Sequence, residues 1–155
     1  MVKVIKSRFT GTGKEGDFKW MIGRPEHART LFIFNDNEGE FYAHFNGGPH
    51  TCGNGEGNAA IRSHQCGDSP RAAGVPTGTY TPGPHYKGYK SLDAQVLKAI
   101  GDAITQIDGL LATGRFDAIA FSWNDETKLG GQIFKTAQPV RDHIVTQLLE
   151  VAARH

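Results

Sequence analysis

The sequence predicts one α/β domain over residues 1–155, with three layers and a mixed, mostly parallel sheet that carries helices on both faces. Three observations lead to this fold class. Segments with strand character and segments with helix character alternate along the chain. Leu31–Phe34 is a run of four apolar residues, which is typical of a strand buried on both faces. Leu92–Thr113 repeats apolar residues with the spacing of an amphipathic helix.

The first third of the chain opens with Met1–Phe9, where apolar and basic residues alternate and predict a strand. Thr10–Phe18 is rich in turn-forming residues and is expected to be a loop. The alternation of apolar residues in Asp17–Ile22 favours a second, short strand. The buried strand Leu31–Phe34 follows, and Gly39–Phe45 is expected to form a short helix.

The middle of the chain alternates glycine-rich loops with short elements. Asn46–Gly57 is expected to be a loop. Asn58–Cys66 contains no breaker and fits a short helix capped by Asn58, whose amide oxygen can accept the N–H groups of the first turn. Ala72–Val75 reads as a short strand, and the prolines and glycines of Thr79–Lys90 predict a loop.

The last third closes with helix, strand, loop and helix. Leu92–Thr113 is the strongest helix, and Gly114 is placed to end it. Phe116–Ser122 is expected to be a strand and Trp123–Gly131 a loop. Pro139 suits the first turn of a final helix, because a proline there loses no intrahelical hydrogen bond.

The composition excludes several function classes. Seventeen Lys and Arg residues stand against 16 Asp and Glu, so the net charge is +1, without the basic excess that duplex nucleic acid requires. No apolar run approaches the roughly 18 residues that span a bilayer. Two cysteines are too few for a disulfide scaffold, which indicates a reducing, cytoplasmic compartment.

Glycine is over-represented, with 20 residues in the chain, and it gathers in the middle third. Two glycine-bearing loops, Gly53–Asn58 and Pro76–Tyr80, follow predicted strands. In open α/β sheets, ligands bind beyond the carboxyl ends of the strands. A glycine loop that opens a helix presents N–H groups to an anion. The first loop, Gly53–Asn58, matches neither the P-loop nor the dinucleotide fingerprint.

Three segments together resemble macro domains, and most closely a group of uncharacterised, often phage-encoded macro-domain-like proteins. These segments are Leu31–Asn37, Gly53–Arg62 and Ala73–Tyr80, and the similarity extends over about residues 30–153. The resemblance implies a macro-like fold. It also implies that two loops cradle the diphosphate of ADP-ribose or of a related NAD-derived nucleotide.

The resemblance predicts a set of ligand-binding residues in or next to these loops. They would offer N–H donors to the diphosphate, hydrogen-bonding groups to the ribose hydroxyls, or an aromatic face. Arg62 would neutralise phosphate or lie on a solvated helix face, and Tyr80 would pack on a ribose or serve as a core or rim aromatic. Trp123 would stack on a base or form a half-buried strand end. The full set is Gly53, Gly55, Gly57, Asn58, Arg62, Thr77, Gly78, Thr79, Tyr80 and Trp123.

If the protein is an enzyme, the resemblance implies an ADP-ribosyl hydrolase. No metal and no cofactor are expected. Asn37 or Asp36 would then orient the water, because Asn35–Asn37 stands where macro domains carry Asn-Ala-Ala-Asn. Asp17 is the candidate counterpart of the aspartate that reads adenine in that family. Residues 38–52 form an insertion between the strand and the glycine loop.

A second group of candidate residues consists of two His/Cys pairs with one residue between the members: His50 and Cys52, and His64 and Cys66. Two cysteines and two histidines form an accepted tetrahedral zinc set, which would make a zinc-containing variant. The simpler expectation is a buried free cysteine with surface histidines, because one-residue gaps are uncommon in zinc sites. A Cys52–Cys66 disulfide is possible, although a cytoplasmic setting argues against it.

The expected partner is therefore a small ADP-ribose-like nucleotide, with no duplex nucleic acid and no membrane. The competing hypothesis is a protein–protein or structural module that keeps the macro-like fold with a degenerate pocket. The sequence leaves the oligomeric state open.

Overall fold

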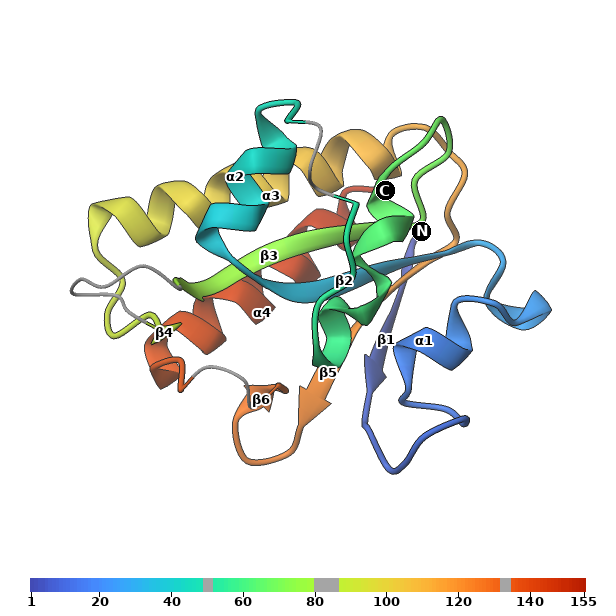
Figure 1. Cartoon of the computed structure of the whole chain (residues 1–155), viewed down its shortest axis with the longest axis horizontal. Coiled ribbons are helices and arrows are strands. Elements are labelled where there is room, and N and C mark those ends of the chain that lie inside the picture. Colours follow the sequence, from blue (N-terminus) through green and yellow to red (C-terminus); the bar gives the residue numbers. More distant parts are fainter. Residues whose placement is uncertain (49–51, 80–86, 132–134) are drawn as a thin grey trace.

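The computed structural model describes residues 1–48, 52–79, 87–131 and 135–155. It confirms the predicted α/β class with a mixed sheet in the order β1-β5-β2-β3-β4, to which β6 is added beside β5 (Figure 1). β1, β5, β2 and β3 run parallel, and the two short strands β4 and β6 run antiparallel to their neighbours. The strands are β1 Lys3–Ser7, β2 Thr30–Asn37, β3 Ala72–Thr79, β4 Lys87–Gly88, β5 Ala118–Asn124 and β6 Lys128–Leu129.

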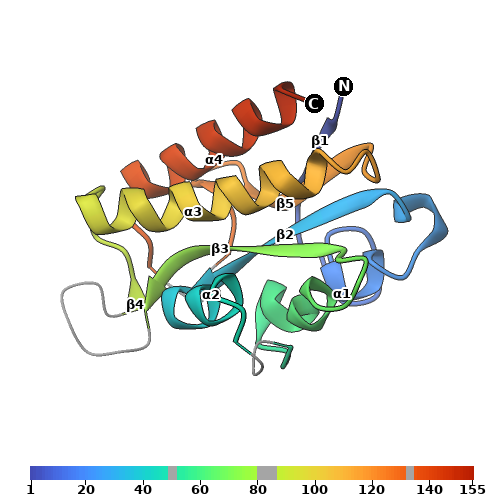
Figure 2. The ribbon, with the colours of Figure 1, turned by 90° about the horizontal axis from the view of Figure 1, so that it is seen from above.

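Helices cover both faces of this sheet, as predicted (Figure 2). α3 (Ala94–Leu111) and α4 (Gln138–Ala153) lie on one face. α1 (Phe18–Met21), α2 (Glu38–Phe45) and the 3₁₀ helix η2 (Gly57–Gln65) lie on the other, and a short 3₁₀ turn, η1 (Pro25–His27), precedes β2. None of the helices in the described ranges is long and apolar enough to cross a bilayer.

The continuous apolar run of β2 divides between the two faces of the sheet. Leu31 and Ile33 belong to the cluster under α3 and α4, whereas Phe32 and Phe34 belong to the cluster under α1 and η2. Successive side chains of a strand point to opposite faces, so a strand between two helical layers needs apolar residues at every position. This arrangement confirms the prediction of a strand buried on both faces.

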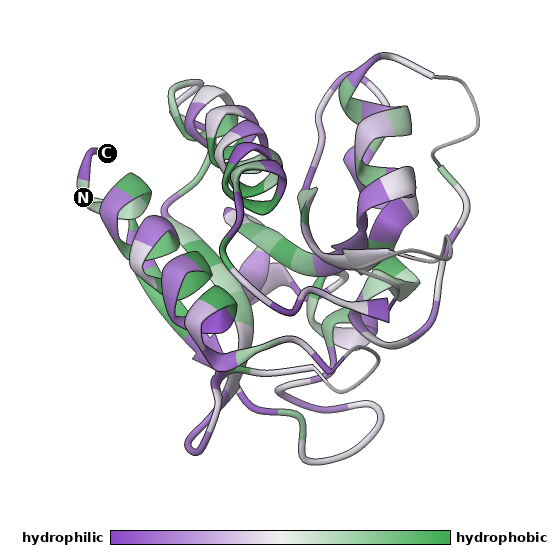
Figure 3. Cartoon of the chain, turned by 90° about the vertical axis from the view of Figure 1, so that its left-hand side faces the viewer, coloured by the Kyte–Doolittle hydropathy of each residue, from purple (hydrophilic) through white to green (hydrophobic). Residues whose placement is uncertain are grey.

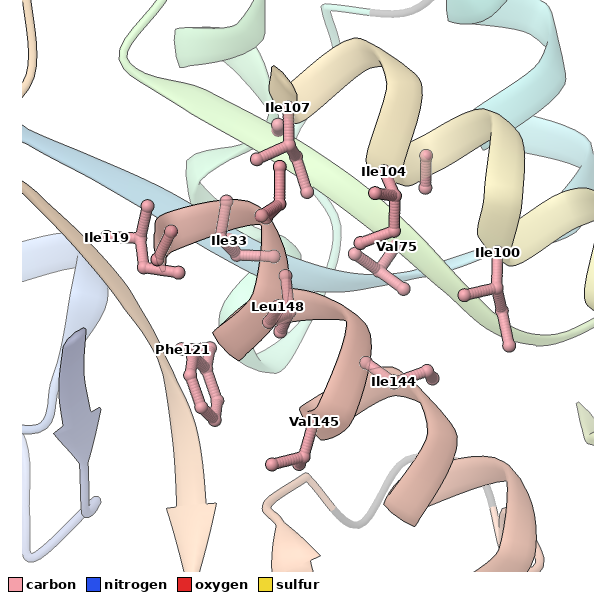
Figure 4. Close-up of a cluster of buried hydrophobic side chains, with 14 of the residues drawn as sticks. Ile33, Val75, Ile100, Ile104, Ile107, Ile119, Phe121, Ile144, Val145 and Leu148 are labelled. Carbon is pink, nitrogen blue, oxygen red and sulfur yellow. The ribbon is translucent and has the colours of Figure 1, made fainter. Parts of the chain in front are cut away.

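The larger cluster lies between the sheet and the pair α3 and α4 (Figure 4). Ile104 of α3 lies against Val75 of β3, and Leu148 of α4 lies near Ile33 and Phe121. In Figure 3 the strands between the layers are mainly hydrophobic, and the helices alternate hydrophobic and hydrophilic positions. The amphipathic pattern predicted for both long helices is thus used to cover one face of the sheet.

Two local predictions are wrong. Asp17–Ile22 is not a strand, because Phe18–Met21 forms α1, which buries Phe18 and Met21 one turn apart. The Asp17 carboxylate caps this helix by accepting from the Lys19 N–H, and so short a segment does not separate a period of two from a helical one. Asn58 does not cap the following helix either, since η2 begins at Gly57.

The strand predicted at Ala72–Val75 is longer than expected. β3 continues through Pro76 to Thr79, and its last two residues pair with β4, which lies inside the segment predicted to be a loop. The register of β2 and β3 shifts after the Asp36–Pro76 pair. A proline cannot donate a ladder hydrogen bond, so an irregularity at this point is expected.

Candidate functional site

A cavity of about 540 Å³ lies at the carboxyl ends of the four parallel strands. Phe9 and Thr12 follow β1, Asn35–Asn37 end β2, Thr77 ends β3, and Ser122–Asn124 end β5. Parallel strands bring their carboxyl ends to one edge of the sheet, which is where open α/β folds bind ligands. The volume falls within the range of about 300–1,000 Å³ that is usual for small-molecule sites.

The cavity brings together seven of the residues predicted for the site. They come from β2, η2, β3 and β5, and they lie up to 87 positions apart along the chain. They are Asp36, Asn37, Gly57, Asn58, Arg62, Thr77 and Trp123.

Other predicted ligand residues lie elsewhere in the described structure. Gly78 and Thr79 pair with β4, and a Cβ on Gly78 would meet the Lys87 carbonyl oxygen at 1.4 Å. Gly78 is therefore needed for the close approach of two strands, and the expected anion loop after β3 is replaced by strand pairing. Gly53 and Gly55 lie beside η2 rather than in the cavity wall. Tyr80 falls outside the described residues.

Arg62 and Asp36 form a buried ion pair in the cavity wall. The guanidinium donates from Nη2 to Asp36 Oδ1 at 2.5 Å, and its Nε lies 3.5 Å from Oδ2. Arg62 Nη1 donates to the Gly53 carbonyl oxygen at 3.2 Å, and both side chains are buried. Arg62 therefore does not lie on a solvated helix face.

The carboxyl of Asp36 is occupied by these contacts. Its Oδ1 also accepts from the Asn37 N–H at 2.9 Å. Burial raises the pKa of Asp36 above its usual range, and the Arg62 guanidinium opposes that rise. A carboxyl that receives donors on both oxygens holds Arg62 in place and is poorly suited to activate a water.

Asn37 serves as the N-cap of α2. Its Oδ1 accepts from the Glu40 N–H at 2.9 Å, in place of the intrahelical acceptor that this N–H lacks. The cap fixes the side-chain oxygen, so the NH₂ group of Asn37 is the part of the amide that can serve a ligand. As a donor it suits a ribose hydroxyl or a phosphate oxygen.

The first turn of η2 forms one rim of the cavity, through Gly57, Asn58, Ala59 and Ala60. The first N–H groups of a helix have no intrahelical acceptor and can bind an anion. Gly57 has φ +59°, which favours glycine at the point where the chain enters the helix. The last two residues of the predicted glycine loop, Gly57 and Asn58, therefore line the cavity.

A second rim, which the sequence reading missed, consists of Leu129–Gly131 after β6. Asn35 Nδ2 donates to the Gly130 carbonyl oxygen at 2.7 Å. A Cβ on Gly131 would meet Asn35 Nδ2 at 2.2 Å, and the φ of +106° at this position also favours glycine. The sequence does contain a signal for this rim: the pair Gly130 and Gly131 follows the predicted strand Phe116–Ser122, and so lies at the same edge of the sheet.

Arg141, from the first turns of α4, anchors this second rim. Its guanidinium donates to the carbonyl oxygens of Leu129 at 2.5 Å, Gly131 at 3.2 Å and Thr136 at 3.0 Å. The residue is 6% exposed and lines the cavity, and burial lowers the pKa of its guanidinium. Its place on the apolar stripe of a predicted helix hid it from sequence reasoning.

Aromatic side chains also line the cavity. Phe9 lines it and is 64% exposed. Trp123 donates from Nε1 to Asp125 Oδ1 at 3.1 Å, and Lys6 Nζ lies 4.3 Å from the centre of its ring. Asp17 also lines the cavity, and its carboxylate is used as the cap of α1.

The expectation of free cysteines is wrong, because Cys52 and Cys66 form a disulfide with their Cα atoms 6.0 Å apart. Neither sulfur is therefore free to bind zinc, as the predicted set of two cysteines and two histidines would require. His50, a member of that set, lies outside the described residues. Within the described ranges, no group of three or more His, Cys, Asp or Glu side chains is placed to hold a metal ion.

Comparisons of this chain with family models, with curated proteins and with solved structures found no match.

Proposed function

We propose that the cavity binds ADP-ribose or a related NAD-derived nucleotide, in the manner implied by the resemblance to macro domains. One observation carries the proposal: a cavity at the carboxyl ends of four parallel strands is bordered by two glycine-bearing rims, Gly57–Ala60 and Leu129–Gly131. Glycine rims let a bulky anion approach the backbone closely. The second rim takes the place that the sequence assigned to Pro76–Tyr80.

The remaining lining groups suit the other parts of a nucleotide. Asn35, Asn37 and Ser122 offer polar groups in the cavity lining, as ribose hydroxyls require. Phe9 and Trp123 add aromatic side chains to the lining, on which a base could stack. A lining of mainly apolar and aromatic side chains with a few polar groups is typical of a small-molecule site.

The contacts of Asp36 and Asn37 favour binding over hydrolysis. Hydrolysis needs a base or an acceptor that orients water, and the acceptor atoms of both side chains are occupied by Arg62, Asn37 N–H and Glu40 N–H. A binding protein needs only the donors that remain. Incubation with an ADP-ribosylated substrate is therefore expected to give no product.

The proposal is tested by thermal unfolding with ADP-ribose, NAD, cyclic ADP-ribose and AMP. A ligand at 100 times its dissociation constant stabilises the fold by about 2.7 kcal/mol. For a domain of this size that free energy raises the melting temperature by several degrees. A melting temperature unchanged by all four nucleotides would favour the structural module with a degenerate pocket.

The matched variants are Ala60→Leu and Ala153→Leu. Ala60 lines the cavity, whereas Ala153 is exposed at the far end of α4. Ala60→Leu is expected to reduce the nucleotide-induced shift, because the larger side chain would project into the cavity, and Ala153→Leu is expected to leave it unchanged. Ala60 is preferred to Gly57, because the positive φ of Gly57 would add backbone strain to any substitution.

A further inference from the structure

The segment Cys52–Gly55, called the strap below, lies along η2 and runs antiparallel to it. Each residue of the strap contacts this helix or the residue that ends it. The first contact is covalent, because Cys52 forms the disulfide with Cys66, which directly follows η2. The other three contacts are hydrogen bonds: the Gly53 carbonyl oxygen with Arg62 Nη1, Asn54 Oδ1 with the Ser63 N–H, and the Gly55 N–H with the Ala59 carbonyl oxygen.

The disulfide is the strongest of these four contacts, and it is the one that a reductant can remove. A single hydrogen bond near the surface adds little to stability, because water competes for both of its groups. The covalent bridge therefore does most to hold the strap against η2. Cys52 is exposed and Cys66 is partly buried, so a thiol in solution has access to the bridge.

The strap leads directly into the wall of the cavity. After Gly55 the chain continues through Glu56 into the first rim, Gly57–Ala60, and all of these residues except Gly55 line the cavity. The next turn of η2 carries Arg62, whose guanidinium contacts Asp36 at the end of β2. The position of η2 thus affects the cavity at two places. A binding element that is fixed before the ligand arrives loses less conformational entropy on binding.

We propose that the Cys52–Cys66 disulfide is a redox switch of the nucleotide site. The oxidised chain holds the first rim in its binding position, and reduction releases the strap and weakens binding. This inference rests on the proposed nucleotide-binding function and adds its regulation. Ala59 and Ile61 are buried in the cluster under α1 and η2, and this packing keeps η2 on the sheet in both states.

The reductant is a dithiol, which supplies two electrons and two protons. One of its thiolates attacks the sulfur of Cys52, the S–S bond breaks, and Cys66 leaves as a thiolate. The second thiolate of the reductant then attacks the reductant sulfur of this mixed disulfide and displaces the thiolate of Cys52. The reductant ends as an intramolecular disulfide, and the two cysteine thiolates take up the two protons.

The first test measures the dissociation constant of ADP-ribose for the oxidised full chain and for the chain reduced with dithiothreitol. Reduction is expected to weaken binding by about tenfold, within the usual range of coupling between two sites. The chain has two cysteines, so dithiothreitol has no other disulfide to break. Cys52→Ser/Cys66→Ser is the control: it should bind like the reduced chain and should not respond to dithiothreitol. Equal dissociation constants for the oxidised and reduced chains overturn the proposal.

The state of the fold is measured on the same samples. The reduced chain is expected to keep the circular dichroism of the oxidised chain. Hydrogen exchange should show loss of amide protection in the strap and η2, whereas α3, on the other face of the sheet, keeps its protection. A reduced chain that unfolds as a whole contradicts the switch, because the bridge would then support the entire fold rather than one rim.

The reverse measurement uses the wild-type chain alone. Coupling is reciprocal, so ADP-ribose should make the disulfide harder to reduce by the factor by which reduction weakens ADP-ribose. The chain is equilibrated with mixtures of reduced and oxidised dithiothreitol, with and without saturating ADP-ribose. The ratio of reduced to oxidised dithiothreitol at the midpoint is expected to rise by about tenfold with ADP-ribose. A midpoint that ADP-ribose does not move also overturns the switch.

The outcomes separate the switch from the proposed function. An oxidised chain that binds ADP-ribose, and binds it equally well or more tightly after reduction, overturns the switch and leaves the nucleotide site standing. A chain that binds none of ADP-ribose, NAD, cyclic ADP-ribose and AMP in either oxidation state overturns the proposed function, and the switch with it.

Discussion

At the scale of single residues, the pair Asp36 and Arg62 shows how burial changes the role of a side chain. The sequence offers Asp36 as a group that orients water and Arg62 as a phosphate ligand. In the fold, the 2.5 Å contact joins them, and Gly53 and Asn37 supply further hydrogen bonds. The pair links η2 to the end of β2, so it positions the first rim of the cavity.

Removing Arg62 is therefore expected to destabilise the fold strongly. Arg62→Met should lower the free energy of unfolding by about 3–5 kcal/mol, because it leaves Asp36 as a buried carboxyl without its counter-charge. Urea denaturation measures the change, with Arg154→Met as the exposed control. In the double variant Asp36→Asn/Arg62→Met the loss should be smaller than the sum of the single losses. Additive losses would show that the two side chains are not coupled.

At the scale of elements, η2 depends on contacts outside its own backbone. No side chain caps its start, and it has 3₁₀ geometry, which makes poorer hydrogen bonds than an α-helix. The segment before it compensates: Asn54 Oδ1 accepts from the Ser63 N–H at 2.9 Å, and Gly55 N–H donates to the Ala59 carbonyl oxygen at 2.8 Å. The disulfide ties this segment to the C-terminal end of η2.

The double variant Cys52→Ser/Cys66→Ser tests this dependence. The bridge closes a loop with a sequence separation of 14 residues. Its loss should cost about 3 kcal/mol by the chain-entropy argument. Hydrogen exchange should show the largest loss of protection in η2. A dithiol should reproduce the effect on the wild type and leave the double variant unchanged. Equal stability with and without the bridge would show that the other contacts of η2 suffice.

At the scale of the whole molecule, the sheet is covered by α3 and α4 on one side and by α1, α2 and η2 on the other, and the cavity lies at one edge of this stack. The rims come from opposite halves of the chain, so the site exists only when both layers are packed on the sheet. Stability of the core and formation of the site are consequently linked.

Two substitutions in α3 separate its buried and exposed sides. Ile100 is 0% exposed and Leu97 is 43% exposed. Ile100→Asp should unfold the protein, because it places an unpaired charge in the main core. Leu97→Asp, on the same helix, should change the free energy of unfolding by about 0.5 kcal/mol or less. Circular dichroism with urea denaturation distinguishes them. A cooperative, native-like transition for Ile100→Asp would mean that α3 is not an essential part of the core.

The sequence by itself determined the α/β class and several elements, because these depend on patterns inside one segment. The apolar run Leu31–Phe34, the periodicity of α3, the helix Gly39–Phe45 and the proline at the start of α4 are all local signals. The sequence also located the part of the cavity built by η2 and by the end of β2.

Only the tertiary structure decided which loops share the cavity. Gly78 and Gly130 both follow a predicted strand. In the fold, however, Gly78 pairs with β4, whereas Gly130 and Gly131 contact Asn35 of β2. The order of strands in a sheet and the contacts of a guanidinium such as Arg141 depend on residues far apart in the chain. Composition and periodicity carry no record of those distant neighbours. The second rim, and the choice between free cysteines and a Cys52–Cys66 disulfide, were therefore decided only in three dimensions.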